Sequence, residues 1–147
     1  MLRKVFSVVA IAALLVNVAC GTPTGSSSTT AAPVTVTPSP STPAMGESRS
    51  FELNLPYANV VACLVMVRQD AARYLLGCIS GPTGSIGVGL QPNTAFTEWG
   101  RGQRIDAEVL VANAPAGTSG SSIFGWQSNV NREKADHILS TPLNWSW

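Results

Sequence analysis

The chain has 147 residues, a formal net charge of +1, one histidine and three cysteines. It contains no basic run, so the composition gives no electrostatic reason to expect binding to nucleic acid. The single histidine, His137, nearly excludes a Cys/His metal cluster, and we expect neither a metal nor another cofactor.

The first twenty residues have the order of an export signal. Arg3 and Lys4 precede an apolar run over residues 5–18, which is followed by Ala19 and Cys20. As a helix this run would be about 21 Å long, whereas a bilayer core needs about 20 residues. The length therefore favours a secretory signal peptide over a transmembrane anchor.

Residues 16–20 resemble the lipobox of bacterial lipoprotein signal peptides, although Asn17 stands where an apolar residue is usual. The resemblance implies that residues 1–19 are removed and that Cys20 carries lipid. The membrane would then be one partner, with the protein anchored on the extracytoplasmic face of the cell membrane. The alternative is an ordinary cleaved signal peptide. The overall layout is similar to that of small actinobacterial surface lipoproteins.

Residues 20–46 have the composition of a tether. Between Gly21 and Gly46, 17 of 26 residues are Ser, Thr or Pro, and none is aromatic or charged. Such a segment buries too little apolar area to offset its ordering entropy, so we expect it to be disordered. It is either a bare spacer or a carrier of O-linked sugar.

Residues 47–147 are expected to form a single, mostly β domain, a small antiparallel sandwich or barrel. Short apolar or alternating segments are separated by Gly, Pro, Asn and Ser clusters. One short helix is expected at 131–139, with Asn131 as its cap. The expected strands are 50–55, 59–68, 73–80, 85–90, 95–99, 104–112, 122–127 and 143–147.

The two remaining cysteines fit a disulfide across a hairpin that turns at 69–72. If facing positions sum to 141, Cys63 lies opposite Cys78, and Val65 and Val67 face Leu76 and Tyr74. An exported chain permits this bond.

Three groups of residues are candidates for chemical sites. The glycine-rich stretch 81–89 lacks the Lys-Ser/Thr ending of a phosphate-binding loop and favours a turn and strand. The serines of 117–122 have only His137 as a base, with Asp136 beside it in sequence. The carboxylates of Glu98, Asp106 and Glu108 could serve a small cell-wall hydrolase, with Asp106 and Glu108 on one strand face about 7 Å apart.

The tryptophans are the best candidates for recognition because they give a large contact area and are enriched in interface hot spots. We predict partner binding by Trp99, Trp145 and Trp147, with burial of the terminal pair in the core as the alternative. Trp126 is expected in the core.

These features predict an envelope binding module without enzymatic activity, whose partner is an envelope protein or a glycan. An inhibitory role, including phage-type exclusion, falls within this prediction. The alternative is the wall hydrolase.

Overall fold

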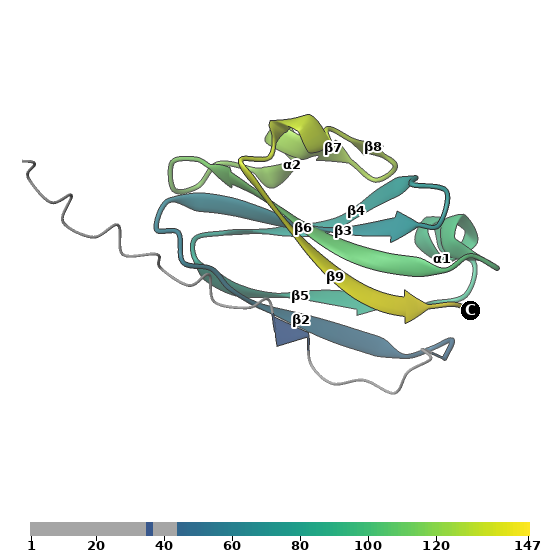
Figure 1. Cartoon of the computed structure of the whole chain (residues 1–147). Helices are drawn as coiled ribbons and strands as arrows, with labels where there is room; N and C mark the ends of the chain where they lie inside the picture. The colour runs from purple at the N-terminus through teal and green to yellow at the C-terminus, as the bar shows by residue number, and fades with distance from the viewer. Residues whose placement is uncertain (1–34, 37–43) are drawn as a thin grey trace, which may run out of the picture.

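The computed structural model describes residues 35–36 and 44–147. In this part of the chain, two antiparallel sheets lie face to face, and short elements form a third layer on the larger sheet (Figure 1). The mostly β prediction is confirmed. The predicted signal peptide and Cys20 lie outside the described residues. In these residues no helix is long and apolar enough to cross a membrane.

The smaller sheet has the strand order β1-β2-β5 and pairs its strands antiparallel. Its alternating sequence buries Phe51, Leu53, Ile86 and Val88 on one face and leaves polar residues and glycines on the other. The strands are β1 (Thr35–Val36), β2 (Ser48–Asn54) and β5 (Thr83–Gly89).

The larger sheet has the order β4-β3-β6-β9, and all its neighbours are antiparallel. Its central strands are apolar on both faces because both faces are covered. One face packs on the smaller sheet and the other on the third layer. The strands are β3 (Val60–Arg68), β4 (Arg73–Ser80), β6 (Ile105–Asn113) and β9 (His137–Trp145).

The third layer covers the second core, around Val61, Leu110 and the buried Phe124. The helix α1 instead closes one end of the main core with Phe96 (Figure 1). The short elements are α1 (Ala95–Gly100), α2 (Gly120–Phe124), the hairpin β7 (Gly125–Trp126) and β8 (Asn129–Val130), and the 3-10 turn η1 (Arg132–Lys134).

The disulfide between Cys63 and Cys78 is confirmed, and their Cα atoms lie 4.0 Å apart. The register beyond it is not the uniform one that we predicted. Cys63 faces Cys78, but Val65 faces Leu75 and Val67 faces Arg73, because a β-bulge leaves Leu76 without a partner. The bulge lets Leu75 join Cys78 in the second core, while Leu76 packs against the main core.

Three local predictions are wrong. Residues 95–99 form a helix because Thr94 and Thr97 make a capping box, with the Thr97 N–H donating to Thr94 Oγ1 over 3.2 Å. Residues 131–139 form η1 and the start of β9, because Ile138 and Leu139 pack into opposite cores as neighbours on a strand do. The 122–127 segment is split between α2 and β7.

The structure describes only residues 35–36 and 44–46 of the predicted tether. Thr35 and Val36 pair with Glu52 and Phe51 of β2. The Gly46 N–H donates to the Leu90 carbonyl over 2.8 Å. Thr35 and Val36 are β-branched residues, which are enriched in strands. The rest of the predicted tether lies outside the described residues.

Candidate functional site

The terminal tryptophans belong to the fold. Trp145 is only 3 % exposed and meets Phe51 edge-on, with ring centroids 5.8 Å apart. Trp147 packs on α1, and its Nε1–H donates to the Thr97 carbonyl over 3.0 Å. The partner-binding prediction is therefore wrong for Trp145, and the alternative of a core residue is correct. Trp147 is tied to the core as well.

Trp99 is also held by its neighbours. Its ring lies 5.5 Å from that of Tyr74 and 6.0 Å from that of Phe96, and the Arg68 guanidinium lies 5.3 Å from its centroid. The ring is partly exposed, but its packing closes the end of the main core. Partner binding by Trp99 stays a prediction.

Trp126 is the aromatic residue that the structure places on the surface, with 65 % of its area exposed. The prediction that it lies in the core is wrong. Phe124 takes the core position instead, and Gly125, at φ 86°, turns the chain outward into the β7–β8 hairpin. In the described residues the only other large exposed hydrophobic side chain is Met45.

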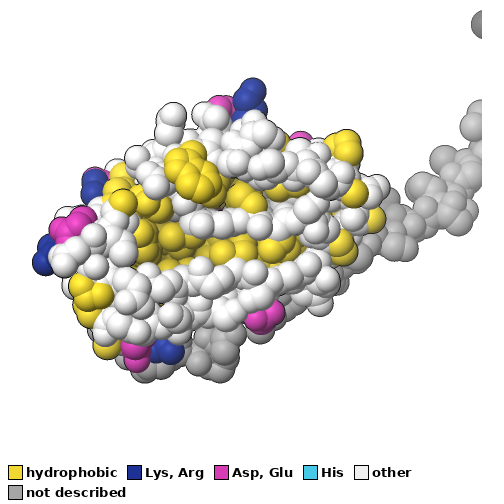
Figure 2. Space-filling model, turned by 180° about the vertical axis from the view of Figure 1, so that it is seen from behind, with side chains coloured by type: hydrophobic (Ala, Val, Ile, Leu, Met, Phe, Trp, Pro, Cys, Tyr) yellow, Lys and Arg dark blue, Asp and Glu magenta, His cyan; other side chains and the backbone are white. Residues whose placement is uncertain are grey.

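Trp126 lines a hollow of about 300 Å³ beside the edge of β4. We call this the Trp126 hollow. No charged residue lines it, so a ligand here would meet one indole ring, small apolar groups and hydroxyls. Seen from behind the view of Figure 1, hydrophobic side chains form a band across the molecule (Figure 2). The lining residues are Leu75, Gly77, Cys78, Ile79, Ser80, Thr118, Ser119, Gly120, Ser121 and Trp126.

Gly120 holds the floor of this hollow against the disulfide. A Cβ added to Gly120 would lie 2.5 Å from the Cys78 Cβ and closer still to both sulfur atoms. The hydroxyls around it stabilise the loop. Ser119 Oγ lies 2.8 Å from Ser121 Oγ, and Ser122 Oγ donates to the Ser119 carbonyl over 2.6 Å. The serine-rich sequence therefore serves the close approach of α2 to the disulfide.

The structure does not assemble a serine-histidine site in the described residues. His137 stacks on Tyr57 at a centroid distance of 4.3 Å. Asp136 accepts hydrogen bonds from the backbone N–H and the side-chain amide of Asn113, at 2.7 and 3.1 Å. No hydrogen bond joins either residue to a serine of the loop.

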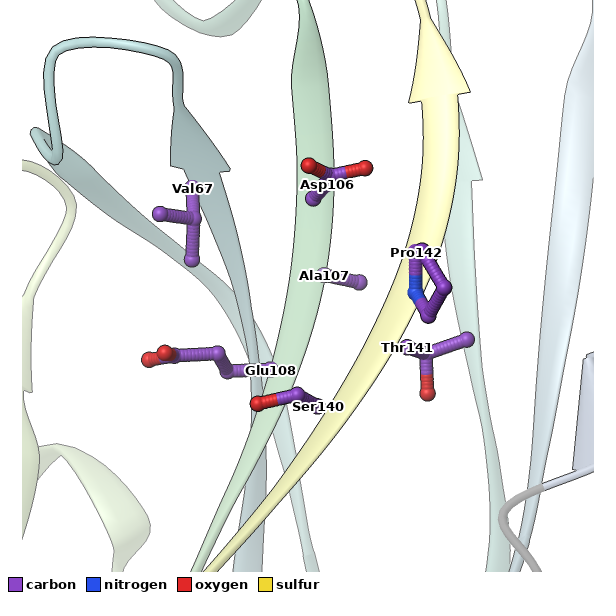
Figure 3. Close-up of a pocket in the computed structure, with 7 residues that line it drawn as sticks. All are labelled: Val67, Asp106, Ala107, Glu108, Ser140, Thr141 and Pro142. Atoms are coloured by element: carbon purple, nitrogen blue, oxygen red, sulfur yellow. The ribbon is translucent and has the colours of Figure 1, made fainter.

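Asp106 and Glu108 border a second hollow, of about 230 Å³, between β3, β6 and β9 (Figure 3). Asp106 Oδ1 accepts the backbone N–H groups of Leu143 and Asn144, both at 3.0 Å. These N–H groups belong to the irregular part of β9, where its register with β6 shifts. Asp106 thus satisfies donors that the sheet ladder leaves without partners.

Glu108 is buried and paired with two arginines. Its Oε2 accepts from Arg73 Nε at 3.2 Å and from Arg132 Nε at 3.1 Å. Burial by itself raises the pKa of Glu108, but the hydrogen bonds from Arg132 and Arg73 outweigh it and lower the pKa below its ordinary value. In Figure 3 its carboxylate extends over β3, away from Thr141 and Pro142.

Glu98 lies apart from this pair, on α1, in an ion pair with Arg101. Both carboxylates at the second hollow hold structural contacts, so the arrangement gives the hydrolase alternative no support. The glycine-rich stretch 81–89 forms a turn and β5, as we predicted. In the described residues no group of three His, Cys, Asp or Glu is placed to hold a metal ion.

Sequence reasoning missed the Trp126 hollow because its apolar segment resembles a buried strand. The signal that could have found it is the pair of flanking turn residues, Gly125 and Asn129. No family model, curated protein or solved structure matches this chain.

Proposed function

We propose that this protein is a lipid-anchored, extracytoplasmic binding module that contacts an envelope protein through the Trp126 hollow. The observation that carries the proposal is the exposed Trp126 ring at the rim of an uncharged hollow. Desolvating one large ring and a charge-free floor costs little and gives much contact area. An inhibitory role, including phage-type exclusion, would act through binding of this kind at the cell surface.

The composition of the hollow favours a protein partner over a glycan. A rigid aromatic anchor is surrounded by Ser, Thr and Gly side chains on the 118–121 loop. Protein-binding loops use this combination, in which an aromatic ring supplies contact area and small polar residues adapt their hydrogen bonds. The disulfide beneath Gly120 limits movement of the floor, which lowers the ordering cost of binding.

The anchor part of the proposal rests on Cys20 and the preceding signal. Stable retention at a membrane takes two or more acyl chains, so we expect a diacylated Cys20. The full chain should partition into the detergent phase, and Cys20→Ala should move it to the aqueous phase. Unchanged partitioning of a correctly processed variant would contradict the anchor.

The binding part is tested by affinity capture from the envelope fraction with the full chain, followed by titration with the purified partner. Trp126→Ala should raise the dissociation constant roughly 30-fold or more, as expected for the loss of about 2 kcal/mol of binding free energy at a hot spot. Met45→Ala is the matched control because Met45 is the other large exposed hydrophobic residue described. Equal effects of both variants, or capture of glycan alone, would overturn the proposal.

A further inference from the structure

Among the described residues, the outer edge of β5 has a row of backbone groups without hydrogen-bond partners. On its inner side β5 pairs with β2. Just beyond the two ends of β5, the Leu90 N–H donates to the Glu47 carbonyl, and the Leu55 N–H donates to the Pro82 carbonyl. Antiparallel pairing alternates, so the N–H and C=O groups of the intervening residues point away from β2. In the described residues no hydrogen bond reaches these outward backbone groups of Thr83, Ser85, Gly87 and Gly89. We call them the β5 edge.

The other edges in the described structure are interrupted or partly covered. On β9, Pro142 and an irregular register interrupt the ladder. On β4 there is a bulge, and the Leu75 N–H donates to the Gln127 carbonyl over 2.7 Å. Part of β2 is covered by β1. By contrast, β5 has seven residues in unbroken register, with no proline and no charge. Soluble proteins normally blunt such an edge, so an open one marks a pairing surface.

We propose that the β5 edge pairs with the β5 edge of a second copy of this chain, antiparallel and about a two-fold axis. The register follows from the strand itself. When facing positions sum to 172, Ser85 lies opposite the copy's Gly87, and Thr83 lies opposite the copy's Gly89. Every outward residue then forms a hydrogen-bonded pair, and Ile86 meets its own counterpart.

A second copy fits this edge because the strand is complementary to itself. Each hydroxyl side chain on the outer face meets a glycine, so no two side chains compete for the same space. No charge is placed opposite a like charge, since the strand carries none. The pairing uses neither Trp126 nor its hollow, and it stands apart from the proposed function.

Cysteine cross-linking tests the register. Full chains carrying Ser85→Cys and Gly87→Cys, both in a Cys20→Ala background, are mixed and oxidised. A Cβ at Gly87 meets only the Arg49 carbonyl, at 4.0 Å, so the substitution fits the fold. We expect the mixture of Ser85→Cys with Gly87→Cys to form a mixed disulfide dimer. Its yield should be at least tenfold higher than that of the control mixture, which combines Glu52→Cys with Gly87→Cys. Equal yields in the two mixtures would overturn the proposal.

Sedimentation of the full chain in detergent supplies the second measurement. Gly87→Pro removes an outward N–H and leaves the bonds to β2 in place, and its own fold is checked by circular dichroism. We expect a dimer for the wild-type chain and a dissociation constant raised more than tenfold for Gly87→Pro. A wild-type chain that stays monomeric at high micromolar concentration would contradict the proposal. Loss of partner binding in Trp126→Ala with dimerisation retained would show that the two surfaces are separate.

Discussion

Gly120→Ala tests the packing of α2 on the disulfide, because two physical effects predict opposite signs. Gly120 begins a helix and does not have a positive φ, so helix propensity alone predicts that alanine stabilises the protein by up to about 1 kcal/mol. Packing predicts the reverse, since the new Cβ would lie 2.5 Å from the Cys78 Cβ, more than 1 Å inside ordinary contact. Overpacking of this kind costs about 1–3 kcal/mol.

The assay is reversible thermal unfolding followed by circular dichroism. For a domain of this size, each kcal/mol shifts Tm by about 4–8 °C, so we expect Gly120→Ala to lower Tm by roughly 5–20 °C. Gly87→Ala is the matched control, because its Cβ would make only an ordinary van der Waals contact, with the Arg49 carbonyl at 4.0 Å. It should change stability by less than about 0.5 kcal/mol. An unchanged or raised Tm for Gly120→Ala would refute the packing argument.

Three further changes have distinct expected outcomes. Replacing Cys63 and Cys78 by alanine should lower the free energy of unfolding by about 3 kcal/mol, measured by urea titration, because the bond closes a loop with a sequence separation of 15. Trp145→Ala should lower it by about 3–5 kcal/mol, and a loss below 1 kcal/mol would show that the ring is not in the core. Glu108→Gln should lower it by about 1–3 kcal/mol at pH 7. Because the folded state lowers the pKa of Glu108, its stabilisation is present above the ordinary value of 4.5 and disappears as the pH falls through the folded pKa. The difference between wild type and Glu108→Gln should therefore shrink below pH 4.5, and a constant difference would contradict the ion-pair account.

Most of the larger β-strands could be predicted from sequence because their patterns are strong. The two apolar runs that form β3 and β4, with a turn between them, brought Cys63 opposite Cys78 as expected. The bulge at Leu76 could not be predicted, because it depends on which core each neighbouring side chain fills. Period-2 patterns say which residues alternate, but an extra residue changes the face of every residue beyond it.

The short elements were harder to predict because local signals compete there. The Thr94 and Thr97 capping box decides the start of α1, although the segment has residues typical of strands. At 131–139, the sequence fits an amphipathic helix, yet the open edge of β6 recruits the chain as β9. Long-range pairing of this kind overrides local propensity.

The position of the candidate site depends on a similar competition, here between two aromatic side chains for one place in the second core. Trp126 and Phe124 are two residues apart, and either could have filled the second core. The positive φ of Gly125 lets Phe124 fill the core and directs Trp126 outward. For Trp145 the difference has the opposite direction, since the ring was predicted to bind a partner and is buried instead. The strand β9 pairs with β6 as far as Trp145, and this pairing places the ring in the main core.

Site-specific photo-cross-linking in living cells tests the central claim most directly. A photoreactive amino acid is placed at position 126 of the full chain, and at position 45 in a control, with both chains checked for membrane retention. The account predicts one discrete protein adduct from position 126, in the membrane fraction, and none of that mass from position 45. No adduct at position 126, or the same adducts from both positions, would contradict a binding module that uses Trp126.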